Sequence, residues 1–216
     1  MKISVNSLEF DINDFKKETL GILETKILKD IMDYVNNLLG PLEHHYYHHY
    51  EHTLEVMYRS LYLGQKENLS QSDLELLAIA SLFHDTGFII QYDKNELIGA
   101  GIAKNYLNSI LFPKEKIHII EKLIEATIVE RQPDNLLESI IKDADTDNLG
   151  RIDFFDKGAR LKKEIETIKN IKILNPDWYH YSLKFLKSHK FYSNSELVER
   201  EQIKEENIGK LEEMNK

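Results

Sequence analysis

The four prolines of this chain limit its fold more than any other feature, because all of them lie between segments with helical apolar periodicity. They are Pro41, Pro113, Pro133 and Pro176, and most of the nine glycines lie in the same gaps. Proline inside a helix removes a backbone hydrogen bond, so this placement is typical of helices joined by loops. Few segments alternate as strands do. The sequence therefore predicts an all-α, single-domain fold.

Apolar residues that recur every three or four positions mark the expected helices. A long first helix is expected over about residues 14–39, a second one carries a histidine-rich segment and ends near Gly64, and a third starts at Ser72, which forms a capping-box pattern with Glu75. Further helices are expected at about 95–110, 114–129, 136–148, 152–170, 177–187 and 195–214.

The chain divides into three parts on this interpretation. Residues 1–42 form an N-terminal helical segment that packs on a core of residues 43–165, and C-terminal helices cover residues 166–216.

Composition excludes several classes of function. No stretch approaches the roughly eighteen consecutive apolar residues of a membrane span, and the N-terminus lacks a secretory pattern, which predicts a cytoplasmic protein without membrane contact. With no cysteine, a metal must be held by histidine and carboxylate. A net charge of -9 argues against broad nucleic-acid binding, while a small phosphorylated ligand and a homodimer stay open.

The histidines are concentrated in "EHHYYHHYEHT", residues 43–53, which holds five of the nine. In a helix, His44, His48 and His52 would form one row and His45 and His49 a neighbouring one, because residues four apart share a face. Only one row can point straight at a metal ion.

Two further segments offer metal ligands. His84 and Asp85 follow the apolar run "LLAIASLF", where a charged pair is costly unless a cation compensates it. In "KDADTDNLG", a helix would place Asp145 on the core face with Leu137 and Ile141, would turn Asp143 away, and would leave Asp147 at the margin in a solvated or capping role.

"YHHYEHT", "FHDTG" and "DADTDNLG" resemble, in order, the signatures of the HD superfamily of metal-dependent phosphohydrolases, over about residues 43–155. The resemblance implies one metal ion held by His52, His84, Asp85 and Asp145. A degenerate HD fold that has lost its ion is the alternative.

The first motif is also similar to that of cyclic-nucleotide phosphodiesterases in the same superfamily, with His49 in place of the usual Asn. This similarity implies that His48 donates a proton to the leaving oxygen, against the alternative that it only supports the site or lies at the surface. His44 and His45 are interpreted as helix-start or surface residues.

Two imidazoles and two carboxylates suit Mn, Fe, Co, Ni or Zn, and an ion of this kind activates water for hydrolysis. The predicted function is therefore hydrolysis of a phosphate ester or nucleotide. Among nearby basic residues, Arg131 in the loop "VERQPDN" is the candidate that binds the substrate.

Three alternatives stay open: a cyclic-nucleotide phosphodiesterase, a non-catalytic nucleotide-binding or signalling domain, and a di-iron oxygenase. The last is disfavoured because only His118 lies between the His-Asp pair and the last Asp, where oxygenases of the superfamily have extra histidines. The corresponding positions here are Asn95, Glu96 and Thr127.

Overall fold

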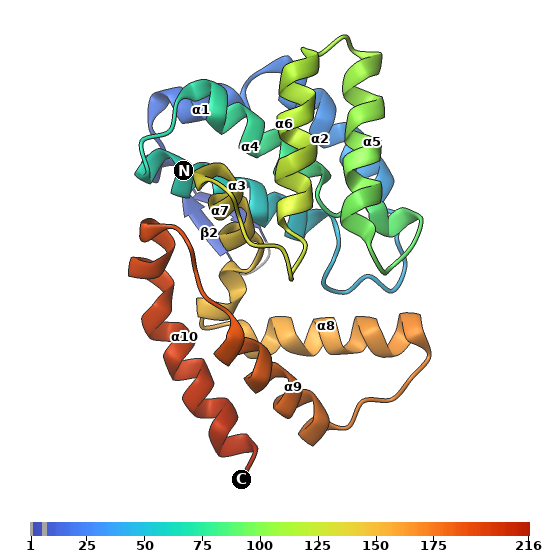
Figure 1. Cartoon of the computed structure of the whole chain (residues 1–216), viewed down its shortest axis with the longest axis vertical. Coiled ribbons are helices and arrows are strands. Elements are labelled where there is room, and N and C mark those ends of the chain that lie inside the picture. The colour runs from blue at the N-terminus through green and yellow to red at the C-terminus, as the bar shows by residue number, and fades with distance from the viewer. Residues whose placement is uncertain (1, 6–7) are drawn as a thin grey trace.

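The computed structural model describes residues 2–5 and 8–216, and Figure 1 shows how its elements are arranged. In chain order they are β1 (Lys2–Val5), β2 (Leu8–Asp11), the 3₁₀ helix η1 (Ile12–Asp14), α1 (Lys17–Leu23), α2 (Lys26–Leu39), α3 (Tyr50–Lys66), α4 (Gln71–Phe83), the 3₁₀ helix η2 (Thr86–Ile89), α5 (Asn95–Ser109), α6 (Lys114–Ala126), α7 (Leu136–Asp145), the 3₁₀ helix η3 (Asp147–Gly150), α8 (Phe154–Lys169), α9 (Asn175–Ser188) and α10 (Asn194–Met214).

Helix α4 is the centre of the larger core. Every residue from Leu76 to Phe83 is buried, because the segment has no polar face to turn toward water. Helices α1, α2, α3, α5, α6 and α7 all pack against it. The end of α4, which carries His84 and Asp85, is therefore held from several sides.

Helices α8, α9 and α10 form a smaller second core. In Figure 1 they lie below the larger bundle in orange and red, and α10 begins beside the bundle and ends at the far side of the smaller core. Leu149 of η3 and Phe191, between α9 and α10, complete this core, whose buried apolar residues are Leu149, Phe154, Leu186, Phe191, Ile208 and Leu211. Helix α10 also packs along η3 and α9, so the second core is joined to the segment that follows α7.

The predicted all-α fold is confirmed, with a short antiparallel hairpin of β1 and β2 added at the start of the chain. The prediction of one long helix over residues 14–39 was wrong. Helices α1 and α2 are separate, and the hydroxyl of Thr25 caps α2 by accepting a bond from the backbone N–H of Leu28. The cap of α4 is Ser70, paired with Asp73, rather than the expected Ser72.

The histidine-rich segment also differs from the prediction. Helix α3 begins at Tyr50, so His44, His45, His48 and His49 precede it instead of forming rows on it. His44 adopts a positive φ of 71°, which an α-helix does not allow.

None of the described helices combines the length and apolarity that a membrane crossing requires. The division into residues 1–42, 43–165 and 166–216 stays a prediction, and residues 1 and 6–7 of its first part lie outside the described residues.

Candidate metal centre

Four predicted ligands are placed by helix ends that meet at one point. His52 lies in the first turn of α3, His84 and Asp85 directly follow α4, and Asp145 is the last residue of α7. His52, His84 and Asp85 are buried, with 3%, 1% and 5% of their surface exposed. The Asp145 side chain is 22% exposed, which makes it the ligand nearest to solvent.

The donor atoms of these side chains lie at short, similar distances. Oδ1 of Asp145 is 3.2 Å from Nε2 of His52 and 3.3 Å from Nε2 of His84. Oδ2 of Asp85 is 3.2 Å from Nε2 of His84 and 3.7 Å from Nε2 of His52. Atoms bound to one ion at about 2.0–2.3 Å lie roughly 3–3.7 Å from one another, so the spacing of His52, His84 and Asp85 fits a single transition-metal ion, and Asp145 faces both histidines.

Two of the four atoms also lack any other partner. Nε2 of His84 and Oδ2 of Asp85 are buried and make no hydrogen bond of acceptable geometry. Buried polar atoms are rarely left in this state, since the loss of solvation is costly. The group His52, His84 and Asp85 could therefore hold a metal ion.

Contacts behind the ligands fix their orientation. Nδ1 of His84 lies 2.7 Å from the backbone carbonyl of Ser81, to which it donates, so Nε2 carries the lone pair that faces Asp145. The amide of Asn95 donates to Oδ1 of Asp85 at 3.3 Å, which leaves Oδ2 for a cation.

Two glycines allow the helices to come this close. A Cβ at Gly87 would lie 1.9 Å from the carbonyl oxygen of Asn95, and a Cβ at Gly99 would lie 2.9 Å from the carbonyl oxygens of Phe83 and His84. Helix α5 thus packs directly on the end of α4, which brings Asn95 to Asp85. Gly87, the glycine of "FHDTG", is therefore needed for the close approach of Asn95.

The charges in the site favour a cation. Burial alone would lower the pKa of His84, but the charges of Asp85 and Asp145 outweigh burial and raise it well above its ordinary value. Burial opposes ionisation of Asp145, yet the neighbouring imidazoles of His52 and His84 hold its pKa well below the usual range. A metal ion would replace the protons at this point.

A sequence comparison relates this region to a known family. A family model described as "HD domain" matches residues 49–147, a stretch that contains all four side chains. We call this matched stretch, residues 49–147, the HD domain. No curated protein matches the chain.

Solved structures share the fold. Bacillus subtilis YpgQ in complex with ADP is 17% identical, with 91% of this chain and 96% of that chain covered and a TM-score of 0.62. A predicted HD superfamily hydrolase from an uncultured Thermotogales bacterium is 19% identical, with 78% and 95% covered and a TM-score of 0.56. Such low identities show a common fold and leave the reaction to be argued from the site.

His48 lies beside the candidate metal centre and is held by a carboxylate that the sequence did not predict. Glu164 of α8 is fully buried; its Oε1 contacts Nδ1 of His48 at 2.5 Å and accepts the hydroxyl of Tyr92 at 3.0 Å. Its Oε2 accepts the backbone N–H groups of Tyr47 and His48 at 2.8 and 3.0 Å. Four contacts on one carboxylate fix the loop before α3.

The same pair shifts both pKa values. Burial alone would lower the pKa of His48, but the hydrogen bond to Glu164 and nearby carboxylates raise it. Burial opposes the charge of Glu164, yet the bond to His48 lowers its pKa to about 2. Nothing near Glu164 in the sequence marks it, because its partner lies 116 residues earlier.

The other aspartates of "DADTD" have different surroundings from those predicted. Asp143 does point away from the metal centre, but it is fully buried and accepts bonds from the backbone N–H groups of Tyr192 and Ser193. The prediction of a solvated or capping role for Asp147 was wrong. It is 3% exposed and pairs with Arg59, Arg151 and Arg200.

The remaining predicted residues lie around the HD domain's edge. Arg131 pairs with Glu125 and Glu138 at 3.1 and 3.4 Å, and its role toward a substrate stays a prediction. His49 pairs with Glu51 at 2.6 Å, and the ring of His45 packs on Phe88.

Proposed function

We propose that the chain is a metal-dependent phosphohydrolase that hydrolyses a nucleotide or a related phosphate ester. The observation that supports the proposal is the buried group of His52, His84 and Asp85, which Asp145 faces through both histidines, with Nε2 of His84 and Oδ2 of Asp85 buried and lacking hydrogen bonds. A divalent ion such as Mn, Fe, Co, Ni or Zn held by these four residues supplies an acidified water and polarises the phosphoryl oxygen.

His48 is the proposed general acid. Because Glu164 occupies Nδ1, the proton for a leaving oxygen must come from Nε2. The His48 ring lies 5.9 Å from that of His52, centroid to centroid, which places it beside the ligands without making it one of them. Glu164 stabilises the charged imidazolium and sets the direction of its ring.

A nucleotide is the proposed substrate class because Bacillus subtilis YpgQ, which shares this fold, is described in complex with ADP. Arg131 is the proposed contact to phosphate, although its guanidinium would have to exchange Glu125 or Glu138 for the substrate. The chain's net charge of -9 makes a long nucleic acid a poor substrate.

The direct test combines metal analysis with a substrate screen. We expect the purified chain to hold about one transition-metal ion and to release phosphate, pyrophosphate or a nucleoside monophosphate from a panel of nucleotides that includes cyclic ones. Stoichiometric metal without hydrolysis of any phosphate ester would contradict the proposal. Absence of metal after growth with Mn, Ni and Co would favour the non-catalytic alternative.

The role of His48 is tested by leaving groups of different acidity. His48→Ala should retain metal and lose about 10²-fold to 10⁴-fold in turnover of esters with poor leaving groups. It should hydrolyse p-nitrophenyl phosphate at close to the wild-type rate, since that leaving oxygen hardly needs a proton. His44→Ala, in the same loop but exposed, is the control and should change neither rate. Equal losses on both esters would leave His48 a positioning residue.

A further inference from the structure

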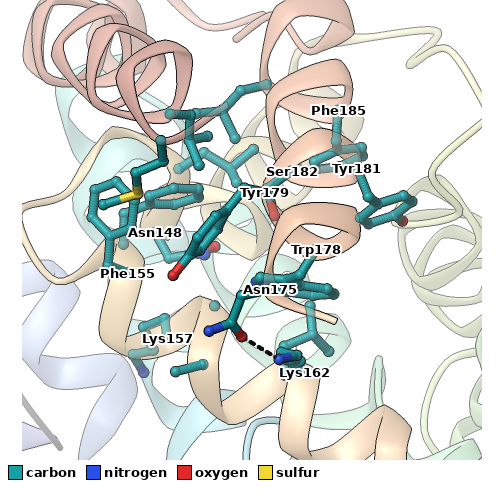
Figure 2. A pocket seen from close by; sticks show the side chains of 18 of the residues that line it. Asn148, Phe155, Lys157, Lys162, Asn175, Trp178, Tyr179, Tyr181, Ser182 and Phe185 are labelled. Atoms are coloured by element: carbon teal, nitrogen blue, oxygen red, sulfur yellow. Dashed lines mark hydrogen bonds between the residues drawn. The ribbon is translucent and has the colours of Figure 1, made fainter. Parts of the chain in front are cut away.

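A cavity of about 280 Å³ lies among α8, α9 and α10, outside the group of metal ligands (Figure 2). Its walls are mostly apolar and include the aromatic side chains of Phe155, Trp178, Tyr179, Tyr181 and Phe185. Figure 2 shows Trp178, Tyr181 and Phe185 on one side, along α9, and Tyr179 in the middle of the view. The volume is close to the lower limit of about 300 Å³ for small-molecule sites.

A few polar groups interrupt these apolar walls. Asn175, Asn148 and Ser182 line the cavity, and the side-chain oxygen of Asn175 accepts a bond from Nζ of Lys162 at 2.6 Å. In Figure 2 the nitrogen of the Asn175 amide lies on the side away from Lys162, below Tyr179. Aromatic walls with amide groups at fixed positions suit a flat heterocycle that needs stacking and edge hydrogen bonds.

The cavity lacks the features of a phosphate site. Nζ of Lys157 contacts the two carboxylate oxygens of Glu55 at 2.8 and 2.7 Å, and Nζ of Lys162 donates to Asn175. Both lysines that line the cavity therefore already have partners. A charged phosphate would be poorly compensated among these rings.

Tyr47 connects the cavity with the metal centre. It lines the cavity and also the narrow cleft beside His52 and Asp145, and Asn148 does the same. The Tyr47 ring lies 4.8 Å from the His52 ring, and its hydroxyl donates to Asn148 at 3.1 Å. The cavity and the metal centre therefore share a wall.

We propose that the cavity among α8, α9 and α10 binds the nucleobase of the substrate, while the phosphate group lies at the metal ligands. The proposal rests on the proposed function, because it takes the substrate to be a nucleotide. It assigns base recognition to the second core and phosphate chemistry to the HD domain. Stacking on aromatic side chains tolerates different bases, so we expect a broad rather than base-specific preference.

Trp178 provides a direct measurement, because it is the only tryptophan in the chain and lines the cavity. Adenosine has no phosphate, so its binding tests the cavity independently of catalysis. We expect adenosine to change the Trp178 fluorescence in a saturable way. An aliphatic alcohol of similar size should bind much more weakly, and equal binding of the two would overturn the assignment to a base.

Gly158→Leu fills the cavity from α8. A Cβ added at Gly158 meets only Nε1 of Trp178, at 3.8 Å, so a larger side chain extends into the open space. We expect it to weaken adenosine binding about tenfold or more, the loss expected when one base-stacking contact is removed. Gly158→Ala should fold with least disturbance and show a smaller loss. Gly21→Leu, at an exposed position of α1 with nothing within 4 Å of an added Cβ, is the matched control.

Kinetics separate this proposal from the proposed function. For Gly158→Leu, kcat/KM for a nucleotide should fall about tenfold or more relative to kcat/KM for glycerol phosphate, mostly through KM, and Gly21→Leu should leave the ratio unchanged. Nucleotide hydrolysis with an unchanged ratio would overturn the base site while the proposed function stands. Adenosine binding that Gly158→Leu weakens, in a protein that hydrolyses no phosphate ester, would support the cavity and overturn the function.

Discussion

Asp145 and Asp147 are two residues apart, yet the carboxylate of Asp145 contacts imidazoles and that of Asp147 contacts guanidinium groups. Asp145 contacts the imidazoles of His52 and His84 at 3.2 and 3.3 Å. Asp147 contacts the guanidinium groups of Arg59 and Arg151 at 3.0 and 3.3 Å and also pairs with Arg200. Both pKa values lie well below the ordinary one, since these partners outweigh the cost of burial.

The difference teaches which cluster can exchange its cation. Guanidinium groups stay protonated at any ordinary pH, so the charge of Asp147 is compensated by the chain itself. An imidazole, unlike a guanidinium, can give up its proton to a metal ion and bind that ion through the freed lone pair, so the charge of Asp145 can be compensated by a metal ion. One cluster joins the HD domain to α10, and the other is available for chemistry.

The largest expected effect is on the exchangeable cluster. Asp145→Ala removes a proposed ligand that faces two others, so metal content and phosphohydrolase activity should fall together, although three ligands remain. Metal analysis by mass spectrometry and a nucleotide assay on the same preparation measure both. Full activity with stoichiometric metal would show that Asp145 is not a ligand.

Asp147→Ala should act on stability instead. It leaves the Arg59 and Arg151 side chains buried, at 4% and 7% exposed, without their shared carboxylate. Breaking a buried ion pair in this way costs about 3–5 kcal/mol of the free energy of unfolding. Urea unfolding measures the change, and Asp145→Ala in chelator serves as the matched control with a smaller loss. A loss below that of Asp145→Ala would remove the contrast between the two clusters.

The sequence was enough to predict that Asp145 lies beside His52 and His84 but not that Asp147 is buried, and the reason is the origin of their partners. The position of Asp145 follows from the apolar face that it shares with Leu137 and Ile141, which is a local property of α7. The partners of Asp147 come from α3, the segment after η3, and α10, so no local pattern reveals that it is buried. Helical periodicity places Asp147 at the margin of the apolar face, where a side chain usually contacts solvent.

The same limit applies to Glu164 and to the histidine loop. The resemblance to HD proteins was enough to propose His48 and His52, and the structure brings them side by side. It could not supply Glu164, whose helix α8 reads only as polar and amphipathic. The start of α3 at Tyr50 was also missed, because histidine and tyrosine carry no strong capping signal, whereas two backbone N–H groups bonded to Glu164 hold the loop out of the helix.

Metal removal should separate the clusters without a mutation. Chelation should lower the melting temperature of the wild type, and added metal should restore it. The free energy of unfolding should rise by about 3 kcal/mol when free metal is about 100 times its Kd. Asp145→Ala should show little response, while Asp147→Ala should respond as the wild type does from a lower starting point. A differential scanning calorimeter measures all three proteins. An unchanged wild-type melting temperature would mean that no ion binds the native site.

The smallest expected effect concerns His189, a partly buried histidine near the same segment. Its Nε2 lies 3.1 Å from the hydroxyl of Thr146, and its Nδ1 is buried without a hydrogen-bond partner. Burial, and then the charges of Lys204 and Lys142, lower its pKa to about 3. Unlike Asp145 and Asp147, His189 is therefore uncharged in the folded protein at neutral pH.

This shift determines how stability depends on pH. Between pH 6.5 and pH 3 the unfolded chain binds a proton at His189 that the folded chain does not, so the contribution to stability is full above pH 6.5 and is lost as pH falls. The slope from this one group is at most about 1.4 kcal/mol per pH unit. In urea unfolding from pH 7.5 to 4.5, His189→Gln should lose stability less steeply than the wild type. His180→Gln, at an exposed site on α9, should keep the wild-type slope. If His189→Gln also keeps that slope, acid sensitivity originates at the imidazole–carboxylate cluster of Asp145, and the contrast with Asp147 becomes the main source of pH dependence.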